Sequence, residues 1–330
     1  MSLASDMARR IANYPTGVLG RNRPWYFLNA IDVVTGGRSL ADAVEGKVVV
    51  ITGASSGVGR ATALAVGRAG ATVVLVARGK DALEDTRAAV EQAGGAACVH
   101  PADLADLDAI GHLAHDVLDE FGAVDVLVNN AGRSIRRSIE LSYDRMHDFQ
   151  RTMQLNYFGA VRLMLSLLPS MRERRTGHVV NISSTGVQAK VPRFAGYVAS
   201  KAALDAFSDC VAAEVHHDNV RFTTVYMPLV RTPMIAPTAI YRRMPAMTPE
   251  EAAAMVCDAI VYRPRRIGTP VGTLAAIGNA VSPRSMDLVR NAAFRLFPDS
   301  KAARGDPTPE SDAVSVQGQL FARVGRGVHW

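Results

Sequence analysis

The feature that most constrains the fold of this chain is a strand, loop and helix pattern in residues 46–70, "GKVVVITGASSGVGRATALAVGRAG". The apolar run Val48–Ile51 is typical of a buried strand, and small and apolar residues at helical spacing follow the glycines. Gly53, Gly57 and Gly59 stand where such a loop must turn tightly and let a pyrophosphate approach backbone N–H groups at a helix start. A plain glycine-rich loop is the alternative, but this order of elements favours nucleotide binding.

The end of the second predicted strand, in "ATVVLVARGKDAL", indicates which nucleotide. A carboxylate at this point would hold the ribose 2′-hydroxyl of NAD. The chain has Ala77 there, with Arg78 beside it, and a guanidinium pairs well with a phosphate. This pair favours NADPH, and a solvated arginine at the strand end is the alternative.

Polar residues also follow the next two predicted strands. Asp103, in "HPADLAD", is placed to accept from an adenine amino group, with a helix cap as the alternative. The run Val124–Val128 leads into residues 129–132, "NNAG", small and polar residues that suit the cleft beyond the carboxyl ends of parallel strands.

A candidate catalytic pair lies in "GYVASKAAL", where Tyr197 and Lys201 are four residues apart and share a helix face. We expect the lysine ammonium to lower the pKa of the phenol, which can then pass a proton to a carbonyl oxygen. Ser184, thirteen residues upstream of Tyr197, is placed to hydrogen-bond a substrate oxygen. Asn156 lies on a helical pattern, where its amide could hold a water leading to Lys201; taken alone it is an ordinary polar helix residue.

Together these residues resemble the short-chain dehydrogenase/reductase family over about residues 46–236. The resemblance implies an α/β fold, a Rossmann doubly wound parallel sheet in a single domain. It also implies a catalytic tetrad of Asn156, Ser184, Tyr197 and Lys201, with Lys201 touching the nicotinamide ribose. The implied contacts to NADPH or NADP come from Gly53, Ser55, Ser56, Gly57, Val58, Gly59, Arg78, Asp103, Leu104, Asn130, Ala131, Gly132, Tyr197, Lys201, Pro228, Val230 and Thr232.

One departure from the family narrows the match. After the sixth predicted strand the family usually has Pro-Gly, whereas this chain has Pro228 and Leu229. The strings "NNAGRSIRRSIE", "RTMQLNYFGAVRL", "YMPLVRTPMIAPT" and "LFPDS" are similar to bacterial long-chain fatty acyl-CoA reductases of the wax-ester pathway. This closer resemblance runs from about Gly46 to the C-terminus, and it implies reduction of a fatty acyl-CoA to an aldehyde with NADPH.

Two groups of residues are candidates for contacts with such a substrate. Arg133, Arg136 and Arg137 follow "NNAG" at the edge of the sheet that carries the site, where we expect the phosphates of CoA. A solvated loop, or an ion pair with Glu140, is the alternative. Leu229, Tyr241 and Met244 lie in the Pro- and Met-rich stretch after the sixth strand, where flexible apolar side chains suit an acyl tail or ordinary core packing.

The expected reaction is direct hydride transfer to the thioester carbonyl, with Tyr197 and Ser184 stabilising the oxyanion and CoA thiolate leaving. No cysteine stands in a recognisable nucleophile context, which argues against a cysteine-bound acyl group. An alcohol or ketone oxidoreductase for an apolar substrate would share the same tetrad. A nucleotide-sensing Rossmann protein is the non-enzymatic alternative, although such a sensor would not need Tyr197 as a proton donor.

Composition sets the remaining bounds. The chain of 330 residues suits one domain at about 44–266, including a substrate lid at about 228–262, with extensions at 1–43 and 267–330. The three cysteines, Cys98, Cys210 and Cys257, suggest a reduced cytoplasmic protein without a metal site. A net charge of +6 without a nucleic-acid motif suits anionic small molecules or an anionic membrane surface. The family resemblance implies a homo-oligomer.

The N-terminal extension contains "RPWYFLNAIDVV", in which Trp25, Phe27, Leu28 and Ile31 have helix-like spacing. We expect a helix packed on the body or on another subunit. Contact with a membrane surface or an acyl chain is the alternative. The chain has no apolar run of the length that spans a membrane, and no signal-peptide layout.

Overall fold

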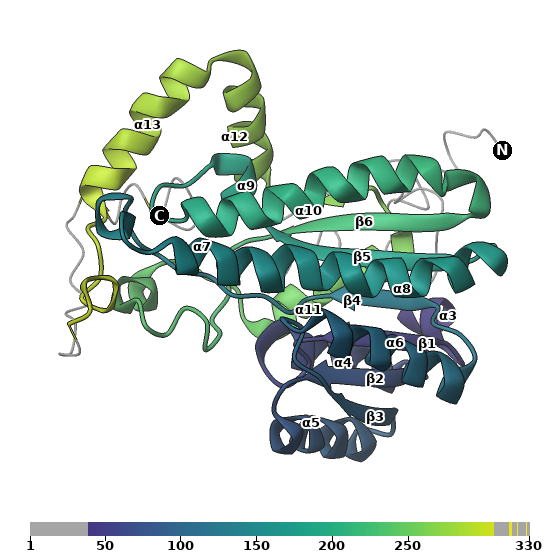
Figure 1. Ribbon diagram of the computed structural model, residues 1–330. Helices are drawn as coiled ribbons and strands as arrows, with labels where there is room; N and C mark the ends of the chain where they lie inside the picture. Colours follow the sequence, from purple (N-terminus) through teal and green to yellow (C-terminus); the bar gives the residue numbers. More distant parts are fainter. Residues whose placement is uncertain (1–38, 307–316, 319–321, 323–327, 329–330) are drawn as a thin grey trace, which may run out of the picture.

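The computed structural model describes residues 39–306, 317–318, 322 and 328, so the predicted helix around Trp25 lies outside the described residues. Seven parallel strands form one sheet in the order β3-β2-β1-β4-β5-β6-β7, with helices on both faces (Figure 1). The predicted Rossmann doubly wound sheet is confirmed. The strands are β1 Val48–Thr52, β2 Thr72–Ala77, β3 Ala96–Pro101, β4 Val126–Asn129, β5 Gly177–Ser184, β6 Val220–Met227 and β7 Arg266–Ile267.

Apolar residues of the strands alternate between two cores, one on each face of the sheet. The first core lies under α3 Leu40–Val44, α4 Gly57–Arg68, α5 Lys80–Gln92 and α11 Pro249–Tyr262. The second lies under α6 Leu107–Phe121, α8 Ala160–Glu173 and α10 Ala195–Glu214. Strands buried on both faces need continuous apolar runs, which explains why β1 and β2 read so clearly in the sequence.

Shorter elements complete the body. Between β4 and α8 lie η1 Glu140–Ser142, α7 Met146–Met153 and the π-helical η2 Gln154–Gly159; further along are α9 Thr185–Ala189, η3 His216–Asp218, η4 Ala239–Arg243 and η5 Ala302–Arg304. Helix α11 begins with a capping box, in which the Thr248 side chain accepts from the Glu251 N–H and Glu251 accepts from the Thr248 N–H.

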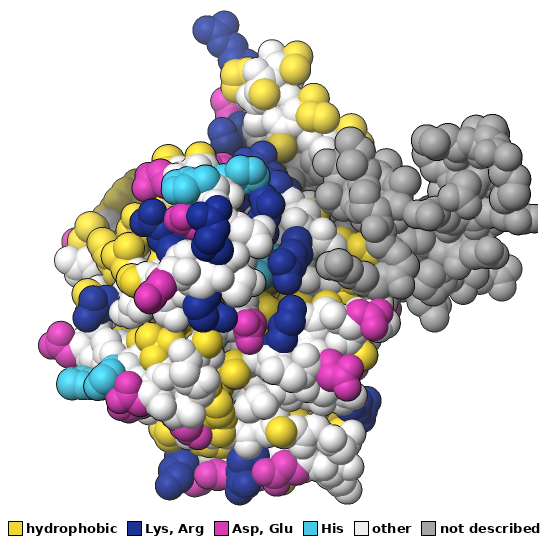
Figure 2. Space-filling view, turned by 90° about the vertical axis from the view of Figure 1, so that its right-hand side faces the viewer, with side chains coloured by type: hydrophobic (Ala, Val, Ile, Leu, Met, Phe, Trp, Pro, Cys, Tyr) yellow, Lys and Arg dark blue, Asp and Glu magenta, His cyan; other side chains and the backbone are white. Residues whose placement is uncertain are grey.

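Beyond the sheet, α12 Pro270–Val281 and α13 Pro283–Leu296 form a helical hairpin that stands off from the body (Figure 1). Apolar side chains are exposed on this projecting part (Figure 2), among them Leu274, Val281 and Leu288. The chain then returns to the body at Phe297, which is fully buried in a third core. None of the helices in the described part of the chain is both long and apolar enough to span a membrane.

Candidate active site

The glycine loop between β1 and α4 is packed too tightly to accept side chains. Gly53 and Gly57 have left-handed φ angles of 67° and 54°. A Cβ on Gly59 would lie 2.3 Å from the Gly53 carbonyl oxygen, and one on Gly53 would lie 2.9 Å from Nδ2 of Asn130. The N-terminus of the 12-residue helix α4 therefore meets the end of β1 with its backbone N–H groups accessible to an anion.

Thr52 joins this loop to the end of β4. Its Oγ1 accepts hydrogen bonds from the backbone N–H groups of Asn130, at 3.0 Å, and Ala131, at 2.9 Å. The Asn130 side chain in turn donates to the Thr52 carbonyl at 2.9 Å. Sequence reasoning placed Asn130 at the cleft but did not foresee that Thr52 holds the two strand ends together.

A cavity of about 520 Å³ opens at this edge of the sheet. Of the predicted cofactor contacts, Gly59 alone does not line this cavity. Gly59 instead packs against the Gly53 carbonyl within the loop. The rest of the predicted set lies on the wall: Gly53, Ser55, Ser56, Gly57, Val58, Arg78, Asp103, Leu104, Asn130, Ala131, Gly132, Tyr197, Lys201, Pro228, Val230 and Thr232. The tight glycine cradle beside an open helix start fits a dinucleotide pyrophosphate.

Arg78 and Asp103, the two residues predicted to contact the adenosine part of the cofactor, both line this cavity. Arg78 lines the cavity together with Ala77 and Gly79, just beyond the end of β2. Asp103 also lines the cavity, and its Oδ1 accepts from the Ala105 N–H at 3.0 Å. The helix cap that was the alternative for Asp103 is made by Asp106, which caps α6, and Asp103 stabilises the turn before that helix.

At the other end of the cavity, three consecutive β5 residues hold α10. The Lys201 ammonium donates to the Ile182 carbonyl at 2.7 Å. Ser183 Oγ donates to Asp205 at 3.2 Å, and Ser184 is hydrogen-bonded to Tyr197 through their side chains. Ser184 Oγ also accepts from the Gly186 N–H, so it caps the short helix α9.

Asn156 lies in the π-helical turn η2 and is fully buried. Its Oδ1 accepts from the Arg133 N–H at 2.7 Å, and its Nδ2 donates to the Arg133 carbonyl and to Ser200 Oγ, both at 2.9 Å. A Cβ built on Gly132 would lie 3.3 Å from Asn156 Oδ1 and 3.5 Å from Lys201 Nζ. The structure thus brings all four tetrad residues together around the end of β5.

The pKa of Tyr197 differs from the expectation that Lys201 would lower it. Burial raises the pKa of Tyr197 to about 12, although the hydrogen bond with Ser184 lowers it. Burial also lowers the pKa of Lys201 to about 8, and the Asp205 carboxylate opposes that shift. Lys201 is not among the groups that move the pKa of the phenol. Desolvation is the largest influence on the pKa of both groups.

A second cavity, of about 300 Å³, is also lined by Tyr197. Among the residues that the structure describes, Tyr197 alone lines both cavities. Apolar side chains supply much of the second wall, including Ile135, Ile139, Phe149 and Phe294. The predicted acid therefore stands between a polar, glycine-rich cavity and a more apolar one.

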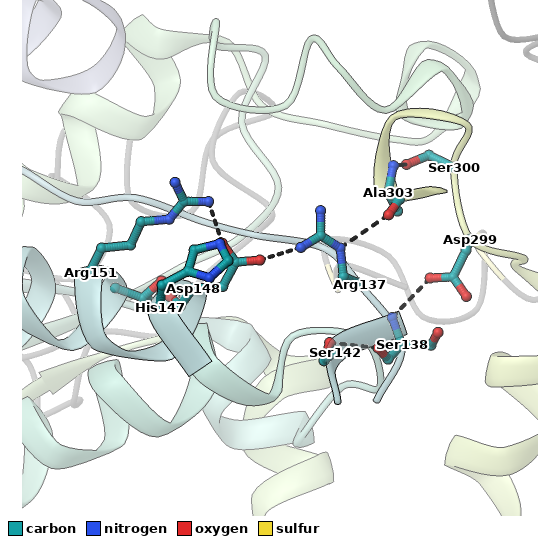
Figure 3. Close-up of polar contacts among 10 residues, drawn as sticks. Arg137, Ser138, Ser142, His147, Asp148, Arg151, Asp299, Ser300 and Ala303 are labelled. Atoms are coloured by element: carbon teal, nitrogen blue, oxygen red, sulfur yellow. Dashed lines mark hydrogen bonds and ion pairs between the residues drawn. The ribbon is translucent and has the colours of Figure 1, made fainter. Parts of the chain in front are cut away.

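Two of the three arginines predicted to bind phosphates hold the C-terminal segment, and one of these two, Arg137, also lines the second cavity. The Arg136 guanidinium donates to the carbonyls of Pro298, at 2.9 Å, and Phe297, at 3.1 Å. Arg137 forms an ion pair with Asp148 and donates to the Ala303 carbonyl at 3.1 Å (Figure 3). Both arginines hold the returning C-terminal segment, whereas Arg133 lines the first cavity.

Other contacts fasten the same segment. Asp299 accepts from the Ser138 N–H at 2.9 Å (Figure 3) and forms an ion pair with Arg193 at 3.2 Å. The Arg193 guanidinium lies 3.9 Å from the centre of the Phe294 ring, so it positions one wall of the second cavity. Neither the alternative ion pair with Glu140 nor a free basic loop describes Arg136 and Arg137.

The predicted acyl contacts Leu229, Tyr241 and Met244 do not line either cavity. All three are buried in the third core, together with Phe194 and Phe297. Core packing, the alternative given for this stretch, is what the structure has. The apolar wall beside Tyr197 comes instead from the loop after β4, α7, the start of α10 and α13.

The described residues bring together one group of three side chains that could hold a metal ion, Cys98, His100 and Glu120. His100 Nε2 lies 3.1 Å from Glu120, and Cys98 Sγ donates weakly to the Val73 carbonyl at 3.7 Å. Burial raises the pKa of the Cys98 thiol to about 11, which disfavours the thiolate that a metal needs. These side chains therefore already have local partners and stand apart from the tetrad.

The family model for short chain dehydrogenases matches residues 47–240. The chain belongs to the short-chain dehydrogenase/reductase family. An uncharacterized oxidoreductase of Mycobacterium tuberculosis is 55% identical over 324 residues, 97% of this chain and 94% of the relative. A fatty acyl-CoA reductase of Acinetobacter baylyi is 52% identical over 287 residues, 87% of this chain and 96% of the relative.

Solved structures agree with this membership of the short-chain dehydrogenase/reductase family. A metagenomic short-chain oxidoreductase in complex with NADP is 31% identical, with a TM-score of 0.58, over 66% of this chain and 92% of that one. This member of the family is an oxidoreductase, and both resemblances predicted from the sequence are confirmed.

The glycine cradle gives a test of cofactor binding. Gly59→Ala should weaken NADPH binding at least tenfold, because its Cβ would push the Gly53 carbonyl out of the loop. Gly79→Ala is the matched control, since Gly79 lines the same cavity but has open space around it and a φ of −84°. The measurement is NADPH fluorescence titration. Equal affinities of the two variants would contradict the role given to the loop.

Proposed function

We propose that this oxidoreductase reduces long-chain fatty acyl-CoA to fatty aldehyde with NADPH. The observation that carries the proposal is the position of Tyr197 on the walls of both cavities. A carbonyl held beside the phenol would have the cofactor on one side and apolar space for a hydrocarbon tail on the other. The similarity to a fatty acyl-CoA reductase of Acinetobacter baylyi supports this substrate class.

The residues of the site suit the chemistry of a thioester. Tyr197 stays protonated at neutral pH, since its pKa is raised to about 12, so its hydroxyl can donate to the substrate carbonyl oxygen. The Ser184 hydroxyl is the second donor beside it. Bound NADPH would supply the hydride to the carbonyl carbon. Transfer of the Tyr197 proton to the former carbonyl oxygen would give a tetrahedral hemithioacetal. The Tyr197 phenolate then takes this proton back as the C–S bond breaks, and CoA thiolate leaves.

Preference for NADPH rests on the end of β2. Ala77 leaves no carboxylate to repel a 2′-phosphate, and Arg78 lines the same part of the cavity. For the phosphates of CoA, Arg133 is the arginine of its loop that lines the first cavity, whereas Arg136 and Arg137 hold the C-terminal segment and Arg137 lines the second cavity.

The proposed function is tested by turnover with palmitoyl-CoA and NADPH, following NADPH oxidation and CoA thiol release together. We expect one thiol for each NADPH oxidised, and Tyr197→Phe should lose at least a hundredfold in rate while still binding NADPH, because only the donated hydrogen bond is removed. A panel of ketones and aldehydes is measured beside it. Rapid reduction of ketones with no thiol release would overturn the acyl-CoA assignment in favour of an alcohol or ketone oxidoreductase.

The cofactor preference has its own test. Arg78→Ala should raise the KM for NADPH about ten- to a hundredfold, the equivalent of a charge-assisted hydrogen bond of about 1.5–3 kcal/mol. The KM for NADH, which has no 2′-phosphate, should change little. Lys80→Ala, which removes a neighbouring exposed charge outside the cavity wall, serves as the control. Equal effects of Arg78→Ala on both cofactors would show that Arg78 does not read the phosphate.

A further inference from the structure

Helix α10 carries a third ionisable residue, Asp205, on the same face as Tyr197 and Lys201. Asp205 is one turn beyond Lys201, so the three side chains follow one another along one helix face at spacings of four. Each member of the row is held by a different residue of the β5 end: Tyr197 by Ser184, Lys201 by Ile182 and Asp205 by Ser183. The same strand end therefore fixes an acid, a cation and a carboxylate.

Asp205 is also fixed from β6. Ser183 and Tyr226 are direct register partners on the adjacent strands β5 and β6. Ser183 Oγ donates to Asp205 at 3.2 Å, and the Tyr226 hydroxyl donates to the same carboxylate. These hydrogen bonds favour the ionised form, whereas burial disfavours it. Burial raises the pKa of Asp205 to about 6, so the carboxylate is charged at neutral pH.

Lys201 needs a counter-charge. Its side chain is almost fully buried, with the Ile182 carbonyl as a neutral acceptor. Burial lowers the pKa of an ammonium, and Asp205 is the carboxylate that opposes this for Lys201. The remaining carboxylate of the row, Asp209, forms ion pairs with Arg265 and Arg266 at the surface.

The other charged and titratable groups around Asp205 are accounted for. Tyr197 and Asp209 share its helix, Tyr226 faces it from β6, and Arg266 approaches from β7. Arg266 interacts electrostatically with Tyr226 and Asp209 as well as with Asp205. Asp205 is thus the carboxylate placed between the surface ion pairs of Asp209 and the buried active-site Lys201.

We propose that Asp205 is a positioning residue of this active site, whose carboxylate keeps Lys201 protonated beside Tyr197. Asp205 itself lines neither cavity, so it acts through Lys201 rather than on a substrate. The role applies to any carbonyl substrate of the enzyme and does not depend on the proposed acyl-CoA activity.

The test measures the proton on Lys201 directly. Trace acetic anhydride is added to the full-length protein across a pH series, and the acetylated Lys201 peptide is quantified by mass spectrometry against exposed Lys80. Only the neutral amine reacts, so the midpoint reports the lysine pKa, which is about 8 in the native protein. Because a nearby negative charge stabilises the ammonium, Asp205→Asn should lower this midpoint by about one pH unit.

Matched variants separate charge from structure. Asp209→Asn removes a carboxylate one turn further along α10 and should leave the Lys201 midpoint unchanged. Asp205→Glu keeps the charge and should stay close to the native midpoint. Thermal unfolding shows whether each variant is folded, and Asp205→Ser replaces Asp205→Asn if the latter is not. An unchanged midpoint in a folded, uncharged Asp205 variant would overturn the proposal.

Discussion

The contact between the end of β5 and one face of α10 is the constraint on which the site depends. The Lys201 hydrogen bond to the Ile182 carbonyl, together with the Ser183 and Ser184 contacts, fixes the rotation of α10 on the strand. Because residues four apart share a helix face, fixing one of the row places the others. A rotation of α10 by one residue would remove Tyr197 from both cavities at once.

The cavities on either side of Tyr197 depend on contacts between distant parts of the chain. On the cofactor side, Thr52 ties the glycine loop of β1 to Asn130 after β4. On the apolar side, Arg193 and Asp299 fasten α13 and the segment after it to the loops of the body. The C-terminal extension is therefore part of the second cavity wall through Phe294, although it lies outside the sheet.

The sequence predicted what local patterns determine. The strand runs, the glycine turn and the spacing of Tyr197 and Lys201 depend on neighbours in the chain, and they led to the fold and to about half of the residues that line the first cavity. The contacts of Arg136 and Arg137 with the C-terminal segment could not be predicted, because those partners are carbonyls more than 150 residues away. Neither could the choice between core and cavity wall for Tyr241 and Met244, since both positions favour apolar side chains.

Asp205 was within reach of the sequence, because the helical spacing that joins Tyr197 to Lys201 continues to it. Its burial and its partner Tyr226 depend on the register of β5 and β6, which only the structure provides. The pKa of Tyr197 likewise depends on desolvation by the folded protein, which raises it, whereas the spacing of Tyr197 and Lys201 led us to expect a lowered pKa.

Because Tyr197 lines both cavities, we expect a cofactor and a long-chain substrate to be bound at the same time. Calorimetric titration with the thioether S-hexadecyl-CoA, which cannot be reduced, measures this when it is done with and without saturating NADP. We expect one binding site in both titrations, with an affinity that NADP does not weaken. Competition, in which the apparent Kd of the thioether rises in proportion to NADP, would contradict it.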